Sequence, residues 1–254
     1  MTGGSFDVAF TPADVRATQV TVVVDVLRAS STIVAALAAG YARVLCAGDV
    51  EQARRLRGPG RELAGERECR KIEGFDHGNS PREFEGTRTG DLVLCTTNGT
   101  PAILAAVAAS DYVLVGSLNN LDALVAAVPA GANTTVVCAG TNGRFALEDA
   151  YTAGRIVGRL EGTLSDAAQA SLRLASAYDQ PLTALTESAD AAALRATGQE
   201  DDIARCARVS VHATVPRVTT ASAGVAVVSG QAQGVAGGEH EVGLTNNPIP
   251  MDRA

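Results

Sequence analysis

The residues of this chain that could do chemistry gather at polar junctions that follow apolar runs. The first junction spans residues 25–32 and opens a predicted helix that ends at Gly40. A helix start carries unpaired N–H groups and the positive end of the helix dipole, so it attracts an anion. An arginine and several hydroxyls at such a start would form a phosphate cradle, whereas an ordinary N-cap with a salt-bridged arginine is the simpler interpretation. Its polar residues are Asp25, Arg28, Ser30, Ser31 and Thr32.

Two further junctions have the same polar character. Residues 96–100 follow an apolar run, and Pro101 suits the first turn of the next helix. Residues 138–149 lead into a helix whose first turn holds Glu148 and Asp149. Ligands of open parallel sheets bind outside the carboxyl ends of the strands, so we expect one pocket if the three strands are parallel neighbours. The second junction would contribute Thr97, Asn98, Gly99 and Thr100 to substrate binding.

A polar stretch over residues 67–86 has neither helical nor alternating periodicity. Loops of this length inside a compact domain are usually functional or disordered, and the density of charge here favours function. Lys71 is the only lysine among 21 basic residues. Either this position needs a compact ammonium group, or a single lysine remains here by chance. The residues of interest are Glu66, Arg67, Lys71, Asp76, His77, Asn79 and Ser80.

Carboxylates at the first and third junctions and at Glu66 predict a magnesium site. Asp25 with Glu66, or with the Glu148–Asp149 pair, could hold Mg²⁺ while waters and a substrate phosphate complete the octahedron. Acidic residues also favour the first turn of any helix, which is the ordinary explanation of Glu148 and Asp149. The cations Arg28, Arg67, Lys71 and Arg144 could neutralise a phosphate ester, although surface ion pairs would explain each of them equally well.

The third junction contains a C-x5-R spacing from Cys138 to Arg144. Thiol phosphatases use this spacing to grip phosphate while a thiolate of low pKa attacks it. A buried cysteine at the end of a core strand is the common alternative. The sequence therefore leaves three candidate nucleophiles, which are a metal-activated water, Asp25 and Cys138.

Alternating strands and helices predict an α/β fold with a layered, mostly parallel or mixed sheet flanked by helices. The site would lie between two closely packed halves if the region 1–218 divides near residue 130. We expect strands at 6–10 (an edge), 20–25, 43–47, 62–64, 91–95, 111–115, 134–138 and 209–218. Helices are expected at 50–56, 101–109, 117–129, 145–160, 165–178, 182–196 and 200–208. The Gly-rich tail, residues 219–254, is expected to be poorly ordered.

Composition excludes several classes of protein. A net charge of −7 argues against nucleic acid or an anionic membrane as partner. The chain has no membrane-spanning apolar run and no signal peptide at its start, which predicts a cytoplasmic location. Five cysteines without a CxxC spacing suggest neither a disulfide framework nor a zinc site. The expected partner is a small-molecule phosphate ester, and a homo-oligomer is compatible with the sequence.

Taken together, the motifs resemble the 2-phosphosulfolactate phosphatase family of coenzyme M biosynthesis. The resemblance covers roughly residues 6–218 and rests on VVDVLRASSTIVAAL, GER followed by KIEGFDHGNSP, TTNGT, VGSLNN and VCAGTNGRFALEDAYTAG. A weaker match follows at Asp201-Asp202, Cys206 and Val215-Pro216. The Gly-rich tail and Cys95 depart from the family pattern.

The resemblance implies an α/β fold and a Mg²⁺-dependent phosphatase. Such an enzyme releases phosphate from 2-phosphosulfolactate or a related phosphate ester of a 2-hydroxy acid and leaves sulfolactate. Carried over by position, the site residues implied by the resemblance are Asp25, Arg28, Ser30, Ser31, Thr32, Glu66, Arg67, Lys71, Asn79, Ser80, Thr96, Thr97, Asn98, Gly99, Thr100, Cys138, Arg144, Glu148 and Asp149. A non-catalytic binding protein for a phosphorylated or sulfonated acid, a thiol-dependent phosphatase using Cys138, and another enzyme acting on a phosphorylated metabolite are the competing hypotheses.

Overall fold

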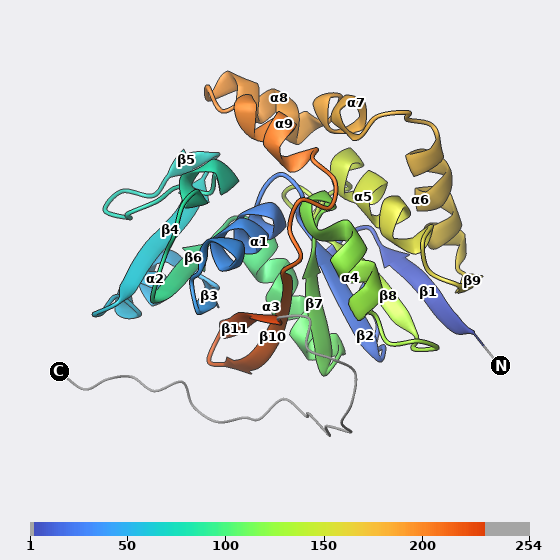
Figure 1. The fold of residues 1–254 in the computed structure, drawn as a ribbon, viewed down its shortest axis with the longest axis horizontal. Coiled ribbons are helices and arrows are strands. Elements are labelled where there is room, and N and C mark those ends of the chain that lie inside the picture. Colours follow the sequence, from blue (N-terminus) through green and yellow to red (C-terminus); the bar gives the residue numbers. More distant parts are fainter. Residues whose placement is uncertain (1–2, 232–254) are drawn as a thin grey trace.

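The computed structural model describes residues 3–231, which form one mixed sheet of eleven strands flanked by helices (Figure 1). The α/β prediction is therefore confirmed. The strands are β1 (Gly4–Ala9), β2 (Val20–Val24), β3 (Arg43–Ala47), β4 (Arg61–Arg67), β5 (Arg70–Lys71), β6 (Asp91–Cys95), β7 (Tyr112–Gly116), β8 (Thr134–Cys138), β9 (Gly162–Leu164), β10 (Val215–Ser222) and β11 (Val225–Gln231).

The helices are α1 (Ala29–Ala39), α2 (Val50–Arg55), α3 (Gly99–Ala109), α4 (Leu121–Ala127), α5 (Leu147–Val157), α6 (Asp166–Ser176), α7 (Pro181–Thr186), α8 (Ala189–Ala196) and α9 (Asp201–Cys206). The order of the helices along the chain is the one that the sequence indicates, with α1 to α5 alternating with strands and α6 to α9 consecutive. Three short 3-10 helices are η1 (Pro12–Asp14), η2 (Pro81–Phe84) and η3 (Leu118–Asn120). No helix within residues 3–231 has both the length and the apolar character needed to cross a membrane.

Local chemistry explains the main boundaries. Gly40 adopts a left-handed conformation with φ of 113° and ends α1, as a C-terminal glycine commonly does. Asp49 caps α2 by accepting a hydrogen bond from the N–H of Gln52 at 2.7 Å. The expected helix over 182–196 is two helices instead, because Ser188 caps a new start by accepting from the N–H of Ala191 at 3.1 Å.

Strands β2, β6 and β8 are buried on both faces. In β2, Val22 and Val24 belong to one apolar cluster together with Tyr151 of α5, whereas Val23 belongs to a second cluster together with Ile33 of α1. Successive side chains of a strand point to opposite faces, so this strand separates two cores. Continuous apolar runs are typical of such strands.

The sheet consists of two parallel blocks joined by an antiparallel hairpin. Its strand order is β5-β4-β6-β3-β11-β10-β7-β2-β8-β1-β9. Strands β4, β6 and β3 are parallel to one another, and so are β7, β2, β8, β1 and β9. The hairpin β10–β11 lies between the blocks and pairs antiparallel with β7 and β3.

The prediction of a poorly ordered tail is wrong for residues 219–231, which complete this hairpin in the middle of the sheet. Val228 is buried in the same apolar cluster as Val23, and Ala223 and Gly224 make the turn with φ of 48° and 78°. Residues 232–254, the rest of the predicted tail, lie outside the described residues. Strand β1 was expected at the edge of the sheet, but β9 pairs with it and forms the edge.

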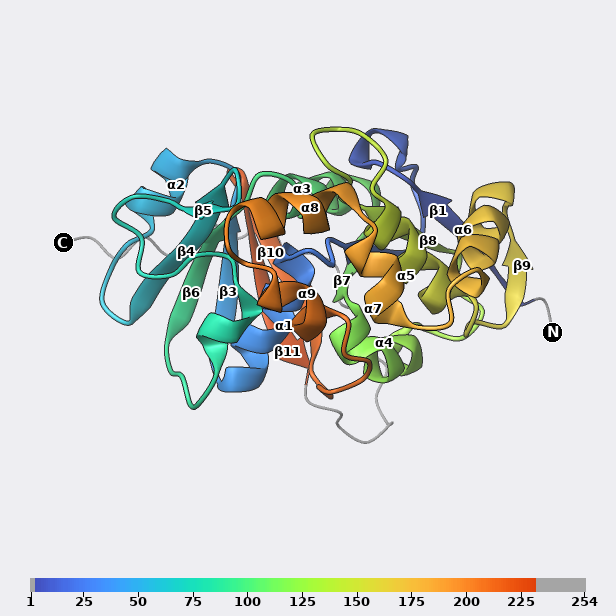
Figure 2. The same cartoon turned by 90° about the horizontal axis from the view of Figure 1, so that it is seen from above.

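The carboxyl ends of β2 and β6, which belong to different blocks, lead into segments that touch each other at Asp25 and Gly99. Three successive antiparallel pairings separate the blocks, so in a flat sheet their carboxyl ends would lie at opposite edges. Neighbouring strands rotate by roughly 20–25°, and a bulge such as the one between Val218 and Thr220 increases that rotation. Seen from above, α8 and α9 lie between the β4–β6 block and the β8–β1 block (Figure 2).

Candidate active site

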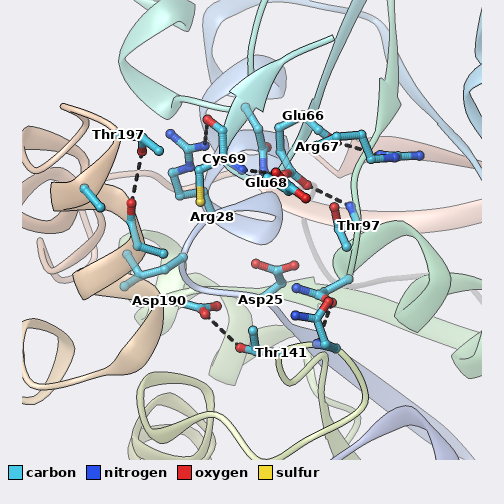
Figure 3. A pocket seen from close by; sticks show the side chains of 16 residues that line it. Asp25, Arg28, Glu66, Arg67, Glu68, Cys69, Thr97, Thr141, Asp190 and Thr197 are labelled. Atoms are coloured by element: carbon cyan, nitrogen blue, oxygen red, sulfur yellow. Dashed lines mark hydrogen bonds between the residues drawn. The ribbon is translucent and has the colours of Figure 1, made fainter.

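One cavity of about 610 Å³ lies where the two blocks meet (Figure 3). Its walls come from the junctions after β2, β6 and β8, from the segment after β4, and from α8. Seven of the residues expected from the sequence line it: Asp25, Arg28, Glu66, Arg67, Asn79, Thr97 and Asn98. The three junctions therefore converge on one cavity, as the sequence predicted.

The reason given for that convergence needs a correction. Strands β2 and β8 are neighbours, but β6 is separated from them by β3, β11, β10 and β7. The junction after β6 still reaches the others, because the N–H of Asn142 donates to Asn98 Oδ1 at 3.1 Å. Gly99 also lies directly against the Asp25 carboxylate. Segments from two separate blocks of the sheet, and not from three neighbouring strands, make the pocket.

Asp25 stands at the start of α1 and is 8% exposed. Its Oδ1 accepts a hydrogen bond from the N–H of Ala29 at 3.0 Å, and its backbone oxygen accepts from the N–H of Ser30 at 2.9 Å. The anion held by the start of α1 is therefore the Asp25 carboxylate itself. Burial raises its pKa to about 7; Asp190 and Glu66 add to the rise, while the Ala29 N–H and Arg28 oppose it.

Glu66 lies across the cavity from Asp25 (Figure 3). Its Oε1 accepts from the N–H of Thr97 at 2.8 Å, and its Oε2 accepts from the N–H of Cys69 at 3.1 Å. Two backbone donors fix this carboxylate in one orientation. Glu66 therefore fastens the junction after β6 to the segment after β4 and brings negative charge to the cavity.

The two arginines of the cavity wall have different partners. Arg28 is 3% exposed, and its Nη1 lies 2.6 Å from Asp202 Oδ2 of α9. Arg67 donates from Nη1 to the backbone oxygen of Glu66 at 2.6 Å and from Nη2 to the sulfur of Cys95 at 3.2 Å. Cys95 thus supports a cation of the site.

Asp190 lines the cavity and was missed by the sequence reasoning. It comes from the first turn of α8, and its Oδ1 accepts from the hydroxyl of Thr141 at 2.9 Å. Burial raises the pKa of Asp190. An acidic residue two positions after a serine cap is ordinary for a helix start, so the sequence carried no signal that would single it out.

The family model described as 2-phosphosulpholactate phosphatase matches residues 8–221 of this chain. The chain belongs to the 2-phosphosulpholactate phosphatase family. A protein of Thermotoga petrophila named probable 2-phosphosulfolactate phosphatase is 37% identical over 214 residues, which cover 83% of this chain and 93% of the relative. The 2-phosphosulfolactate phosphatase of Methanothermobacter thermautotrophicus is 39% identical over 196 residues, which cover 77% of this chain and 84% of the relative.

Several residues that the family resemblance placed at the substrate instead form hydrogen bonds within the protein. The hydroxyl of Ser30 donates to the backbone oxygen of Asp25 at 2.8 Å, and that of Ser31 donates to the backbone oxygen of Val26 at 2.9 Å. The Thr32 hydroxyl donates to the backbone oxygen of Asn79 at 2.9 Å. All three hydroxyl residues are buried, so the expected phosphate cradle of hydroxyls is absent from the described cavity lining.

Predicted substrate-binding residues of the second junction (residues 96–100) and of the charged stretch (residues 67–86) also have partners within the protein or lie outside the cavity. The Thr100 hydroxyl donates to the backbone oxygen of Thr96 at 3.0 Å, and the Thr100 N–H, in the first turn of α3, donates to the Thr96 hydroxyl at 3.0 Å. Ser80 donates to Asp202 Oδ1 at 2.6 Å. Lys71 lies exposed on β5, outside the cavity. These residues shape the walls of the site without facing its space.

Asp149 and Glu148 also differ from their predicted role as metal ligands of this cavity. Asp149 accepts from the N–H groups of Val26 at 2.9 Å and Gly140 at 3.0 Å, so it ties the first junction to the third. Glu148 is 1% exposed and borders a neighbouring cavity. Burial raises its pKa to about 8, with Asp190 as the next contributor, and its Oε2 has no hydrogen-bond partner within the described chain.

The C-x5-R arrangement is not that of a thiol phosphatase. Cys138 is fully buried in an apolar cluster, and burial raises its pKa well above the ordinary value, with Asp149 and Glu148 adding to the rise. Arg144 is exposed and borders the neighbouring cavity together with Glu148. A thiolate nucleophile needs an accessible and electropositive environment, which is the opposite of the one found.

The donor set fits a cation that protein and substrate hold jointly. Within residues 3–231, no group of three or more His, Cys, Asp or Glu side chains is disposed to hold a metal by itself. Mg²⁺, however, is usually bound by one or two carboxylates plus waters and substrate phosphate. Four acidic side chains, Asp25, Glu66, Glu68 and Asp190, line the cavity against two basic ones, Arg28 and Arg67. Asn79 adds a buried Oδ1 with no hydrogen-bond partner in the described chain.

Proposed function

We propose that this protein hydrolyses 2-phosphosulfolactate, or a closely related phosphate ester of a 2-hydroxy acid, to the free hydroxy acid and phosphate. The observation that carries the proposal is the meeting of Asp25, Arg28 and Asp190 at one cavity in a chain of this family. The names of its relatives support the substrate. The cavity volume of about 610 Å³ is in the range of small-molecule sites.

The charge of the cavity supports a requirement for Mg²⁺. An ester that carries phosphate, carboxylate and sulfonate is strongly anionic, whereas acidic side chains outnumber basic ones in the cavity wall. Asp25 and Glu66 would hold the ion, and Asn79, which lines the same cavity, offers a neutral oxygen. When bound, Mg²⁺ would neutralise phosphate charge and polarise the phosphoryl group.

The side chains of the cavity would do the remaining work. Arg28 and Arg67 bind the anionic groups of the substrate, because phosphoryl transfer depends mainly on positioning and on stabilisation of charge. Asp190, whose carboxyl keeps its proton more readily because it is buried, donates that proton to the leaving oxygen. The α8 helix that carries Asp190 also covers the cavity with Ala193 and Ala196 and so reduces the access of water.

A thiol-dependent reaction is the weaker candidate, because Cys138 is buried away from the cavity. The test is phosphate release from 2-phosphosulfolactate and from 2-phospholactate, measured with chelator and after addition of Mg²⁺. Release that stops with chelator and returns with Mg²⁺ is the expected result. Binding of the ester without any release, with or without Mg²⁺, would instead support the non-catalytic binding protein.

A further inference from the structure

A buried ion pair connects α9 to the cavity wall. Arg28 Nη1 lies 2.6 Å from Asp202 Oδ2, and both side chains are 2% exposed. The same Nη1 also donates to Gln199, in the turn before α9. The pair therefore joins the first junction of the site to a helical segment more than 170 residues further along the chain.

Asp202 uses its second oxygen for the charged stretch. Its Oδ1 accepts from the hydroxyl of Ser80 at 2.6 Å. Gln199 reaches the same stretch by donating from Nε2 to the backbone oxygen of Cys69 at 2.5 Å. Three segments that line or border the cavity thus meet at the Asp202 carboxylate, which is itself not part of the cavity lining.

The opposite edge of the Arg28 guanidinium is available to a ligand. Its Nη2 makes one long hydrogen bond, 3.5 Å, to the backbone oxygen of Cys69, and its Nε donates to no acceptor among the described residues. Arg28 nevertheless lines the cavity. An arginine offers five N–H groups in a fixed planar fork, so fixing Nη1 orients all of the others.

Stability alone does not explain such a pair. Burying two charges costs desolvation energy, and well-packed apolar residues often serve a fold as well or better. We propose that Asp202 is a positioning residue that acts through Arg28: it holds the guanidinium so that its free edge meets an anionic group of the substrate. This inference rests on the proposed function, since the anion is a group of the phosphate ester.

The first experiment compares Asp202→Asn with Asp201→Asn. Asp201 is the adjacent residue of α9, but its side chain is 69% exposed and pairs with Arg82 on the surface. We expect kcat/KM for 2-phosphosulfolactate to fall roughly 100-fold in D202N, because the fork loses its charged support, and to change less than about 2-fold in D201N. Ser80→Ala, which removes only the second partner of Asp202, should change kcat/KM less than about 5-fold.

The second experiment separates positioning from folding. In Arg28→Ala, added guanidinium ion should restore phosphate release at least about 10-fold, because Asp202 holds the free ion in the vacated place. In the double variant Arg28→Ala, Asp202→Asn, which leaves no unpaired buried charge, guanidinium should restore nothing. Thermal unfolding of each variant measures the fraction folded at the assay temperature.

The outcomes separate the two claims. Equal rescue of the single and double variants, or full kcat/KM in folded D202N, would overturn the role of Asp202 while wild-type turnover keeps the proposed function. If the wild type releases no phosphate from either ester with Mg²⁺ present, the proposed function fails and this inference fails with it.

Discussion

A Cβ atom on Gly99 would lie 2.6 Å from Oδ2 of Asp25, closer than such atoms can approach. The same Cβ would lie 2.4 Å from the Cβ of Ala29, the first residue of α1. Close approach of the two junctions therefore demands glycine at position 99. We expect Gly99→Ala to displace the carboxylate and to lower kcat/KM for phosphate release by roughly 100-fold, since a 1 Å misplacement in a site can cost that much.

Gly58→Ala is the matched control for this substitution. A Cβ at Gly58 would meet nothing within 4 Å, and the residue lies in the turn after α2 and is not part of the cavity lining. Wild-type kinetics in G58A with a large loss in G99A is the expected pair of results. Equal kinetics of the two variants would mean that Asp25 needs no fixed position.

Cys138 should be dispensable for turnover. Cys138→Ala removes a buried thiol from an apolar cluster, so we expect a free energy of unfolding lower by about 1 kcal/mol and a kcat within about 3-fold of the wild type. Cys69 is the cysteine that lines the cavity, although burial raises its pKa and slows its alkylation. Because an alkylated Cys69 would occupy part of the cavity, iodoacetamide should inhibit the wild type and C138A slowly, and should not inhibit Cys69→Ala. A folded C138A protein without activity would instead support the thiol mechanism.

Asp190 should matter most when the leaving group is poor. An alkoxide such as that of sulfolactate needs a proton as it departs, whereas the nitrophenolate of p-nitrophenyl phosphate does not. Asp190→Asn is expected to lower kcat for 2-phosphosulfolactate roughly 100-fold and for p-nitrophenyl phosphate only a few-fold. Glu187→Gln, an exposed acid just before α8, is the control. Equal losses for both esters would exclude Asp190 as the proton donor.

Glu148 should make the protein less stable as pH rises. Burial raises its pKa to about 8 in the folded state, against about 4.3 in an unfolded chain. Between these values the folded state binds a proton that the unfolded state has lost, so the free energy of unfolding falls with rising pH, by up to about 1.4 kcal/mol per pH unit. Glu148→Gln should flatten this slope between pH 5 and pH 8 in urea unfolding. An unchanged slope would contradict the raised pKa.

Much of the fold could be predicted from local pattern. Strands β3, β6 and β8 have the predicted bounds, because each is a short apolar run between polar residues. Residues 219–231 of the hairpin were missed because Gly, Ala and Ser make up more than half of them, although Val225, Val227 and Val228 are buried. Its place between the two blocks depends on pairing with β3 and β7, which are distant in sequence and leave no local signal.

The site was predicted by motif more successfully than by role. Asp25, Glu66 and Arg28 do line one cavity. The hydroxyl of Ser30, in contrast, makes a short-range hydrogen bond to the backbone, and a sequence cannot tell such a bond from one to a ligand. Asp190 reaches the cavity only through tertiary packing of α8, so no spacing in the chain could reveal it.

Asp25→Asn gives the most direct test of the account. Because an amide of the same shape removes the carboxylate at the start of α1 and leaves the packing intact, phosphate release from 2-phosphosulfolactate with Mg²⁺ present should fall by at least about 1,000-fold while Tm stays within a few degrees. Isothermal titration of the folded variant with the ester distinguishes lost chemistry from lost binding. Phosphate release at the wild-type rate in D25N would contradict the assignment of this cavity as the active site.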